Sequence, residues 1–99
     1  MTTAVTANGT RPRLLFVEDE EIVRNVIGRA LSDYEVILVE DAERALDLMV
    51  ADPAAIVITD IVLPRMDGCA MAARIREYWP GVPVLAVSGR VSDADVEEF

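Results

Sequence analysis

The sequence predicts an α/β fold in which a parallel sheet is covered by helices. Short apolar runs alternate along the chain with segments whose apolar residues recur at helical spacing. Three of the apolar runs end abruptly in an acid or a hydroxyl, as in Phe16-Val17-Glu18, Ile58-Thr59-Asp60 and Ala86-Val87-Ser88. Such runs are typical of strands buried on both faces. Because the carboxyl ends of parallel strands meet at one edge, these polar residues are expected together where such folds bind ligands.

The elements are expected in the order β-α-β-α-β-α-β-α, joined by right-handed crossovers. The apolar runs that predict the strands are residues 14–17, 36–39, 55–59 and 84–87. Three helical faces are predicted by Ile22, Val23, Val26, Ile27, Ala30 and Leu31, then by Ala42, Ala45, Leu46, Met49 and Val50, and then by Met71, Ala72, Ile75, Tyr78 and Trp79. Asp41 is the expected N-cap of the second helix, and Ser92 that of a fourth helix running to Phe99. Cys69 is expected as a small buried apolar residue. Tyr78 and Trp79 are expected in the core or at the end of a helix packed on the sheet.

Length and composition indicate one domain of 99 residues, 53% of them hydrophobic, with a flexible tail over 1–12 and a folded part over 13–99. No run is long enough to cross a membrane and no signal peptide is evident, so we expect a cytoplasmic protein. The formal charge of −9 argues against nucleic acid as a partner. All nine basic residues are Arg, and the chain has no Lys and no His. Cys69 is alone, which excludes an intramolecular disulfide.

The acids that follow two of the strands predict a metal site. Glu18, Asp19 and Asp60 converge if the first and third strands are neighbours. Oxygen ligands of this kind suit Mg²⁺, and the backbone carbonyl of Val62 is a further candidate ligand. An aspartate can act as a nucleophile toward phosphorus, which gives Asp60 a chemical role. Ser88 is placed to donate a hydrogen bond to a phosphoryl oxygen.

Each of these features also has an ordinary structural interpretation. The acids at 18–21 suit the start of a helix, and Asp60 is compatible with a simple loop start. Ser88-Gly89 is a common turn, and Asp67-Gly68 is a common turn and helix start. Their occurrence together, in order and at successive strand ends, favours a functional site.

The chain resembles the receiver domain of two-component response regulators. The residues that carry this resemblance are Leu14-Leu15-Phe16-Val17-Glu18-Asp19-Glu20, Ile58-Thr59-Asp60-Ile61-Val62-Leu63-Pro64-Arg65-Met66-Asp67-Gly68 and Pro83-Val84-Leu85-Ala86-Val87-Ser88-Gly89. The resemblance implies a flavodoxin-like doubly wound sheet with strand order 2-1-3-4-5. It also implies that Asp60 is the phosphoacceptor, that Glu18 and Asp19 hold Mg²⁺, and that Ser88 is the switch hydroxyl. The phosphoryl donor would be a phosphohistidine on a histidine kinase or a phosphotransfer protein.

The sequence departs from the receiver pattern near its end. Receivers carry a Lys after a fifth strand, and this chain has neither that Lys nor the fifth β/α unit, so we expect a truncated receiver. Arg90 is not an equivalent cation. We further expect impaired phosphotransfer, and association through the bared sheet as a homodimer, an exchanged strand or helix, or a poorly soluble protein.

Two alternatives to a phosphorylated receiver remain open from the residues. One is a pseudo-receiver, a binding module that is never phosphorylated, which the missing Lys favours. The other is an aspartyl-phosphate hydrolase, which normally needs an acid two residues after the nucleophile, where this chain has Val62. On the leading interpretation the protein is a phosphorylatable switch that signals by protein contacts, and not an enzyme.

Overall fold

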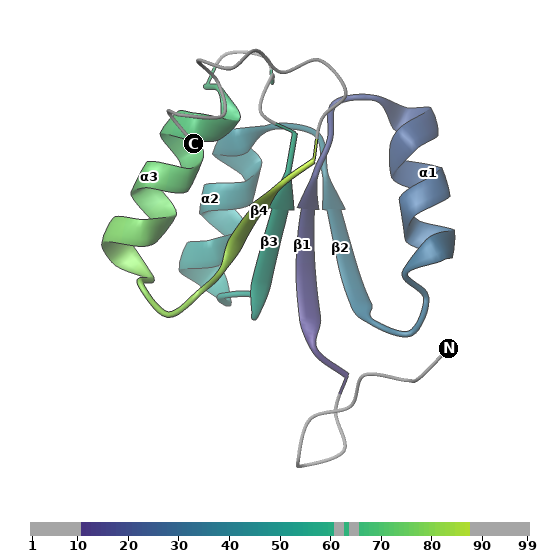
Figure 1. Ribbon diagram of the computed structural model, residues 1–99, viewed down its shortest axis with the longest axis horizontal. Coiled ribbons are helices and arrows are strands. Elements are labelled where there is room, and N and C mark those ends of the chain that lie inside the picture. The colour runs from purple at the N-terminus through teal and green to yellow at the C-terminus, as the bar shows by residue number, and fades with distance from the viewer. Residues whose placement is uncertain (1–10, 61–62, 64–65, 88–99) are drawn as a thin grey trace.

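The computed structural model describes residues 11–60, 63 and 66–87 as a sheet with helices on both sides (Figure 1). The strands are β1 (Arg13–Val17), β2 (Glu35–Val39), β3 (Ile56–Thr59) and β4 (Val84–Ala86), and the helices are α1 (Glu21–Ala30), α2 (Ala42–Ala51) and α3 (Gly68–Tyr78). The predicted alternation is confirmed through β4. The expected fourth helix, most of the expected tail, Val62 and Ser88 lie outside the described residues.

All four described strands are parallel and lie in the order β2-β1-β3-β4. This order agrees with the expected 2-1-3-4 arrangement and confirms the flavodoxin-like α/β fold. Phe16 pairs with Leu38 on one side and with Ile58 on the other, and Ile58 pairs with Leu85. The register therefore places one row of apolar side chains across the whole sheet.

The main core lies between the sheet and the pair α2 and α3. Because side chains alternate along a strand, Leu15, Val17 and Val57 point to this side, where they meet Met49 and Ile75. In Figure 1, α2 and α3 stand on one side of the strands and α1 stands on the other. Trp79 packs against this core, whereas Tyr78 is exposed and lies at the end of α3, which agrees with the second of its two expected places.

Two of the helices begin where their side chains predict. Asp41 caps α2 by accepting a hydrogen bond from the backbone N–H of Arg44 at 2.8 Å, and Asp67 caps α3 in the same way from Ala70. Asp67-Gly68 is thus the helix start that its ordinary interpretation predicted. Cys69 is buried, as expected of a small apolar residue.

The predicted apolar face of helix α1 is only partly covered by the described residues. It has no fully buried residue, and Ile22 is 78% exposed. The helix packs closely on β2, since a Cβ added at Gly28 would lie 3.2 Å from Cδ1 of Leu38. It covers β2 and leaves part of its own apolar face open. None of the described helices has the length and apolar character that a membrane crossing requires.

Candidate metal and phosphoacceptor site

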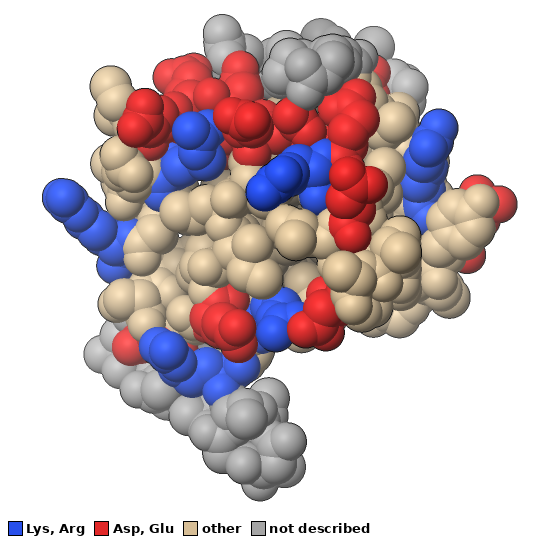
Figure 2. All heavy atoms as spheres, turned by 180° about the vertical axis from the view of Figure 1, so that it is seen from behind, with Lys and Arg blue, Asp and Glu red and all other residues tan. Residues whose placement is uncertain are grey.

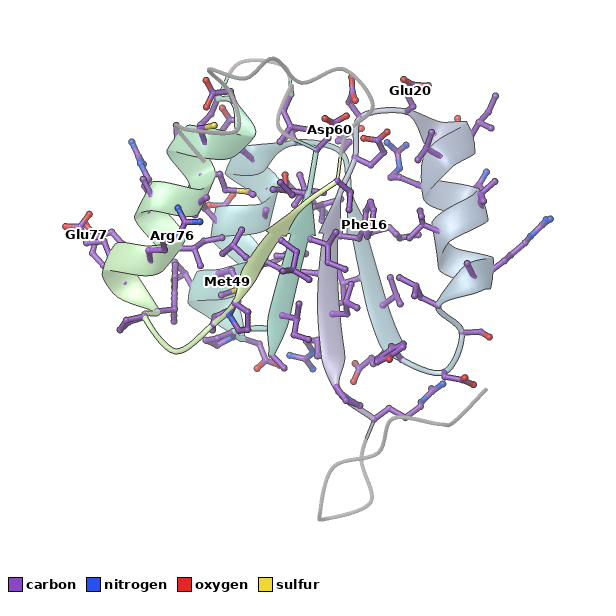
Figure 3. The ribbon with its side chains drawn as sticks, in the orientation of Figure 1. Phe16, Glu20, Met49, Asp60, Arg76 and Glu77 are labelled. Atoms are coloured by element: carbon purple, nitrogen blue, oxygen red, sulfur yellow. The ribbon has the colours of Figure 1, made fainter. Side chains whose placement is uncertain are left out.

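The candidate site lies at the carboxyl edge of the sheet, where β1 and β3 end side by side. Glu18 and Asp60 are the first residues after these two strands. Their backbones continue the hydrogen bonding of the sheet. The N–H of Glu18 donates to the carbonyl oxygen of Val39 at 2.9 Å, and the N–H of Asp60 donates to that of Val17 at 3.1 Å. The sheet itself therefore sets the positions of both carboxylates. Asp60 and Glu20 lie on this same rim in Figure 3.

Three carboxylates come together at this edge. Glu18, Asp19 and Asp60 each offer an oxygen atom, and these atoms all lie within 4.8 Å of one another. Glu18 is 6% exposed and Asp60 is 7% exposed, whereas Asp19 is open to solvent. The predicted convergence of residues from separate parts of the chain is therefore found.

The surroundings of Glu18 make its ionised form costly. Burial, the negative charge of Asp60 and a hydrogen bond with Asp60 raise the pKa of Glu18 from 4.5 to about 7. The charges of Asp19 and Glu20 act in the same direction. A divalent cation would remove this repulsion, and clustered carboxylate oxygens are the ligands that Mg²⁺ prefers. The residues present thus fit the expected ion.

The wider rim is also acidic. Figure 2 shows red acidic side chains gathered along the upper rim, with blue basic side chains among them. Such a rim attracts cations toward the site.

Two further residues at the site are not apparent from sequence patterns. Nη1 of Arg24, on α1, donates to the backbone carbonyl of Glu18 at 2.8 Å. The buried hydroxyl of Thr59 donates to the backbone carbonyl of Asp60 at 2.8 Å. Neither contact follows from a motif, because each depends on how a side chain turns back onto the main chain.

A shallow hollow of about 380 Å³ adjoins the site at the end of β2. Arg24, Leu38, Val39, Glu40 and Arg44 line it. Two arginines thus line this hollow, and one of them, Arg24, contacts Glu18 of the acidic cluster. Val62 and Ser88, the other expected site residues, lie outside the described residues, so their roles stay predictions.

With this geometry in view, comparison with known proteins identifies the family. Residues 14–99 match the response regulator receiver domain family, and the chain belongs to it. It is 35% identical over 82 residues to the response regulator MprA of Mycolicibacterium vanbaalenii, an alignment that covers 81% of this chain and 36% of that protein. It is likewise 35% identical over 83 residues to the sensor histidine kinase TmoS of Ectopseudomonas mendocina, covering 81% of this chain and 8% of that one. The chain thus spans about a third of the length of the response regulators that it matches.

Solved structures give the same result for the fold. The signal receiver domain of an HD domain-containing protein from Pseudomonas fluorescens Pf-5 superposes with a TM-score of 0.86 and 27% identity, over 95% of this chain and 71% of that one. The chemotaxis response regulator CheY4 of Vibrio cholerae superposes with a TM-score of 0.82 and 25% identity, over 90% and 78% of the two chains. This chain is therefore a receiver domain of two-component signalling, a phosphoacceptor class and not a class of enzymes.

Proposed function

We propose that Asp60 accepts a phosphoryl group from a phosphohistidine, in a reaction that requires Mg²⁺. The observation that carries this proposal is the cluster of Glu18, Asp19 and Asp60, whose oxygen atoms lie within 4.8 Å of one another at the carboxyl edge of the sheet. Receiver family membership supports it, and a receiver implies a cognate histidine kinase.

The chemistry assigned to Asp60 is a simple displacement. One carboxylate oxygen of Asp60 attacks the phosphorus atom of the donor, and an O–P bond forms as the N–P bond of the phosphohistidine breaks. The imidazole nitrogen keeps the electron pair of the broken bond and is free to take up a proton. The buried position of Asp60, fixed by the end of β3, presents this oxygen in a set direction.

Glu18 and Asp19 are assigned to the cation, together with Asp60 and the carbonyl of Val62. When bound, Mg²⁺ would offset the negative charge that the carboxylates and the phosphoryl group bring together. Glu18 must lose its proton to serve as a ligand, which its raised pKa opposes near neutral pH. Ser88 is assigned to donate a hydrogen bond to the phosphoryl oxygens.

The expected location of the protein in the cytoplasm stays a prediction.

Intact-mass spectrometry after exposure to acetyl phosphate, with and without Mg²⁺, tests the proposal. We expect the unaltered chain to gain one phosphoryl group only when Mg²⁺ is present, and Asp60→Asn to gain none. Asp67→Asn is the matched control, because it removes a carboxylate outside the cluster while Asn still caps α3.

Two results would contradict this assignment. A gain of mass by Asp60→Asn would mean that another residue accepts the phosphoryl group. No gain by the unaltered chain would favour the pseudo-receiver, whose function is binding alone.

A further inference from the structure

We propose that Arg24 is a positioning residue of the cation site, an inference that rests on the proposed Mg²⁺-dependent function. Nη1 of Arg24 lies 2.8 Å from the backbone carbonyl oxygen of Glu18. A hydrogen bond from a charged donor is stronger than a hydrogen bond between neutral groups. The half-buried guanidinium therefore restrains the peptide that joins the two cluster carboxylates Glu18 and Asp19.

The main chain of Glu18 is held on both sides of its Cα by two different elements. Its N–H donates to Val39 at the end of β2, and its carbonyl oxygen accepts from Arg24 on α1. Only residues 18–20 separate β1 from α1, and the backbone N–H of Arg24 itself donates to Glu20. Arg24 thus closes this short connection through both its main chain and its side chain. Without the side-chain bond, the sheet alone would fix Glu18, and the peptide leading to Asp19 would be free to rotate.

The direction in which Mg²⁺ affinity changes when Arg24 is removed distinguishes two possible roles of this residue. If Arg24 acted only as a nearby positive charge, removing it would tighten the binding of a cation by the acidic cluster. If Arg24 positions the ligands, removing it weakens binding, because outer contacts that orient metal ligands typically contribute 10–100-fold in affinity. The two roles predict opposite changes in the same measurement.

Calorimetric titration of the metal-free chain with Mg²⁺ distinguishes these roles. We expect Arg24→Met, which keeps an unbranched stem without charge or donor, to bind Mg²⁺ about tenfold more weakly. Arg24→Lys keeps a charged donor and should lie between this variant and the unaltered chain. Arg29→Met is the matched control, because it removes an exposed Arg from the last turn of the same helix.

A purely structural role is separated by thermal unfolding with and without Mg²⁺. Lower stability alone would reduce both midpoints equally, whereas weaker binding reduces the increase that Mg²⁺ produces. Should Arg24→Met fail to fold, Arg24→Gln takes its place with the same expected loss, since its amide is too short to replace the guanidinium.

Equal or tighter Mg²⁺ binding by the Arg24 variant would overturn the inference. So would an equal loss in Arg29→Met, which would assign the effect to a general perturbation of α1 rather than to the contact with Glu18. Failure of the unaltered chain to bind Mg²⁺ is a separate result, because it would overturn the proposed function and the positioning role with it.

Discussion

At the scale of single residues, the burial of Glu18 beside Asp60 makes stability depend on pH. The pKa of Glu18 is about 7 in the folded chain, against 4.5 in the absence of the fold. Between these values the folded chain binds more protons than the unfolded chain, so the free energy of unfolding falls as pH rises. We expect the metal-free protein to be more stable at pH 5 than at pH 8 in urea denaturation.

Variants of the carboxylates test the origin of this dependence. Glu18→Gln should flatten the fall in stability between pH 5 and pH 8, while Asp47→Asn on the exposed side of α2 should preserve it. Added Mg²⁺ should stabilise the unaltered chain more at pH 8 than at pH 5, because its ligands must be deprotonated. An unchanged pH dependence in Glu18→Gln would show that another group titrates.

The acidic site could be predicted from the sequence because the topology of a parallel sheet determines where the residues after its strands lie. Residues that directly follow neighbouring parallel strands must meet at one edge, so Glu18 and Asp60 are brought together by the β1–β3 pairing alone. Arg24 is different, since its bond to a carbonyl depends on the exact position of α1 over the end of β1. No spacing rule encodes that position.

At the scale of elements, the side-chain caps determine where helices begin. The carboxylate of Asp67 accepts from the backbone N–H of Ala70 at 2.8 Å and closes the first turn of α3. We expect Asp67→Ala to lower the free energy of unfolding by about 1 kcal/mol, because one N–H at the helix start loses its partner. Chemical denaturation measures this loss. Asp67→Asn should stay close to the unaltered chain, and an equal loss in both variants would mean that the charge matters more than the cap.

The helices also differ in how well their packing could be predicted. Apolar residues at helical spacing identified both the existence of α2 and the burial of Ala42, Ala45 and Met49. The same pattern in α1 predicted a helix correctly, yet Ile22 and Val26 on its apolar face are exposed, as is Val50 on that of α2. Periodicity shows which face is apolar, but the neighbouring elements decide whether that face is covered.

At the scale of the whole molecule, the two sides of the sheet are covered unequally. Helices α2 and α3 pack on one side, while α1 packs on the other side over β2 (Figure 1). Leu85 continues the row of Phe16 and Ile58 on the α1 side, and it is 51% exposed. Among the described strands, β4 also has a hydrogen-bonded neighbour on one side only, namely β3. Within the described part of the chain, exposed apolar groups thus lie on the outermost strand of the sheet.

This combination leads us to expect that the 99-residue chain associates with a second copy of itself. Apolar surface and unpaired strand edges both favour association, and the register places Leu85 where the two features meet. In sedimentation velocity at increasing concentration, Leu85→Lys should shift the chain toward monomer, since a charge on an edge strand opposes pairing. Val50→Lys is the matched control, because it charges an even more exposed apolar site on α2, across the sheet from α1. A monomer at every concentration would contradict the expectation, and an equal effect of both substitutions would assign association to general hydrophobicity rather than to β4.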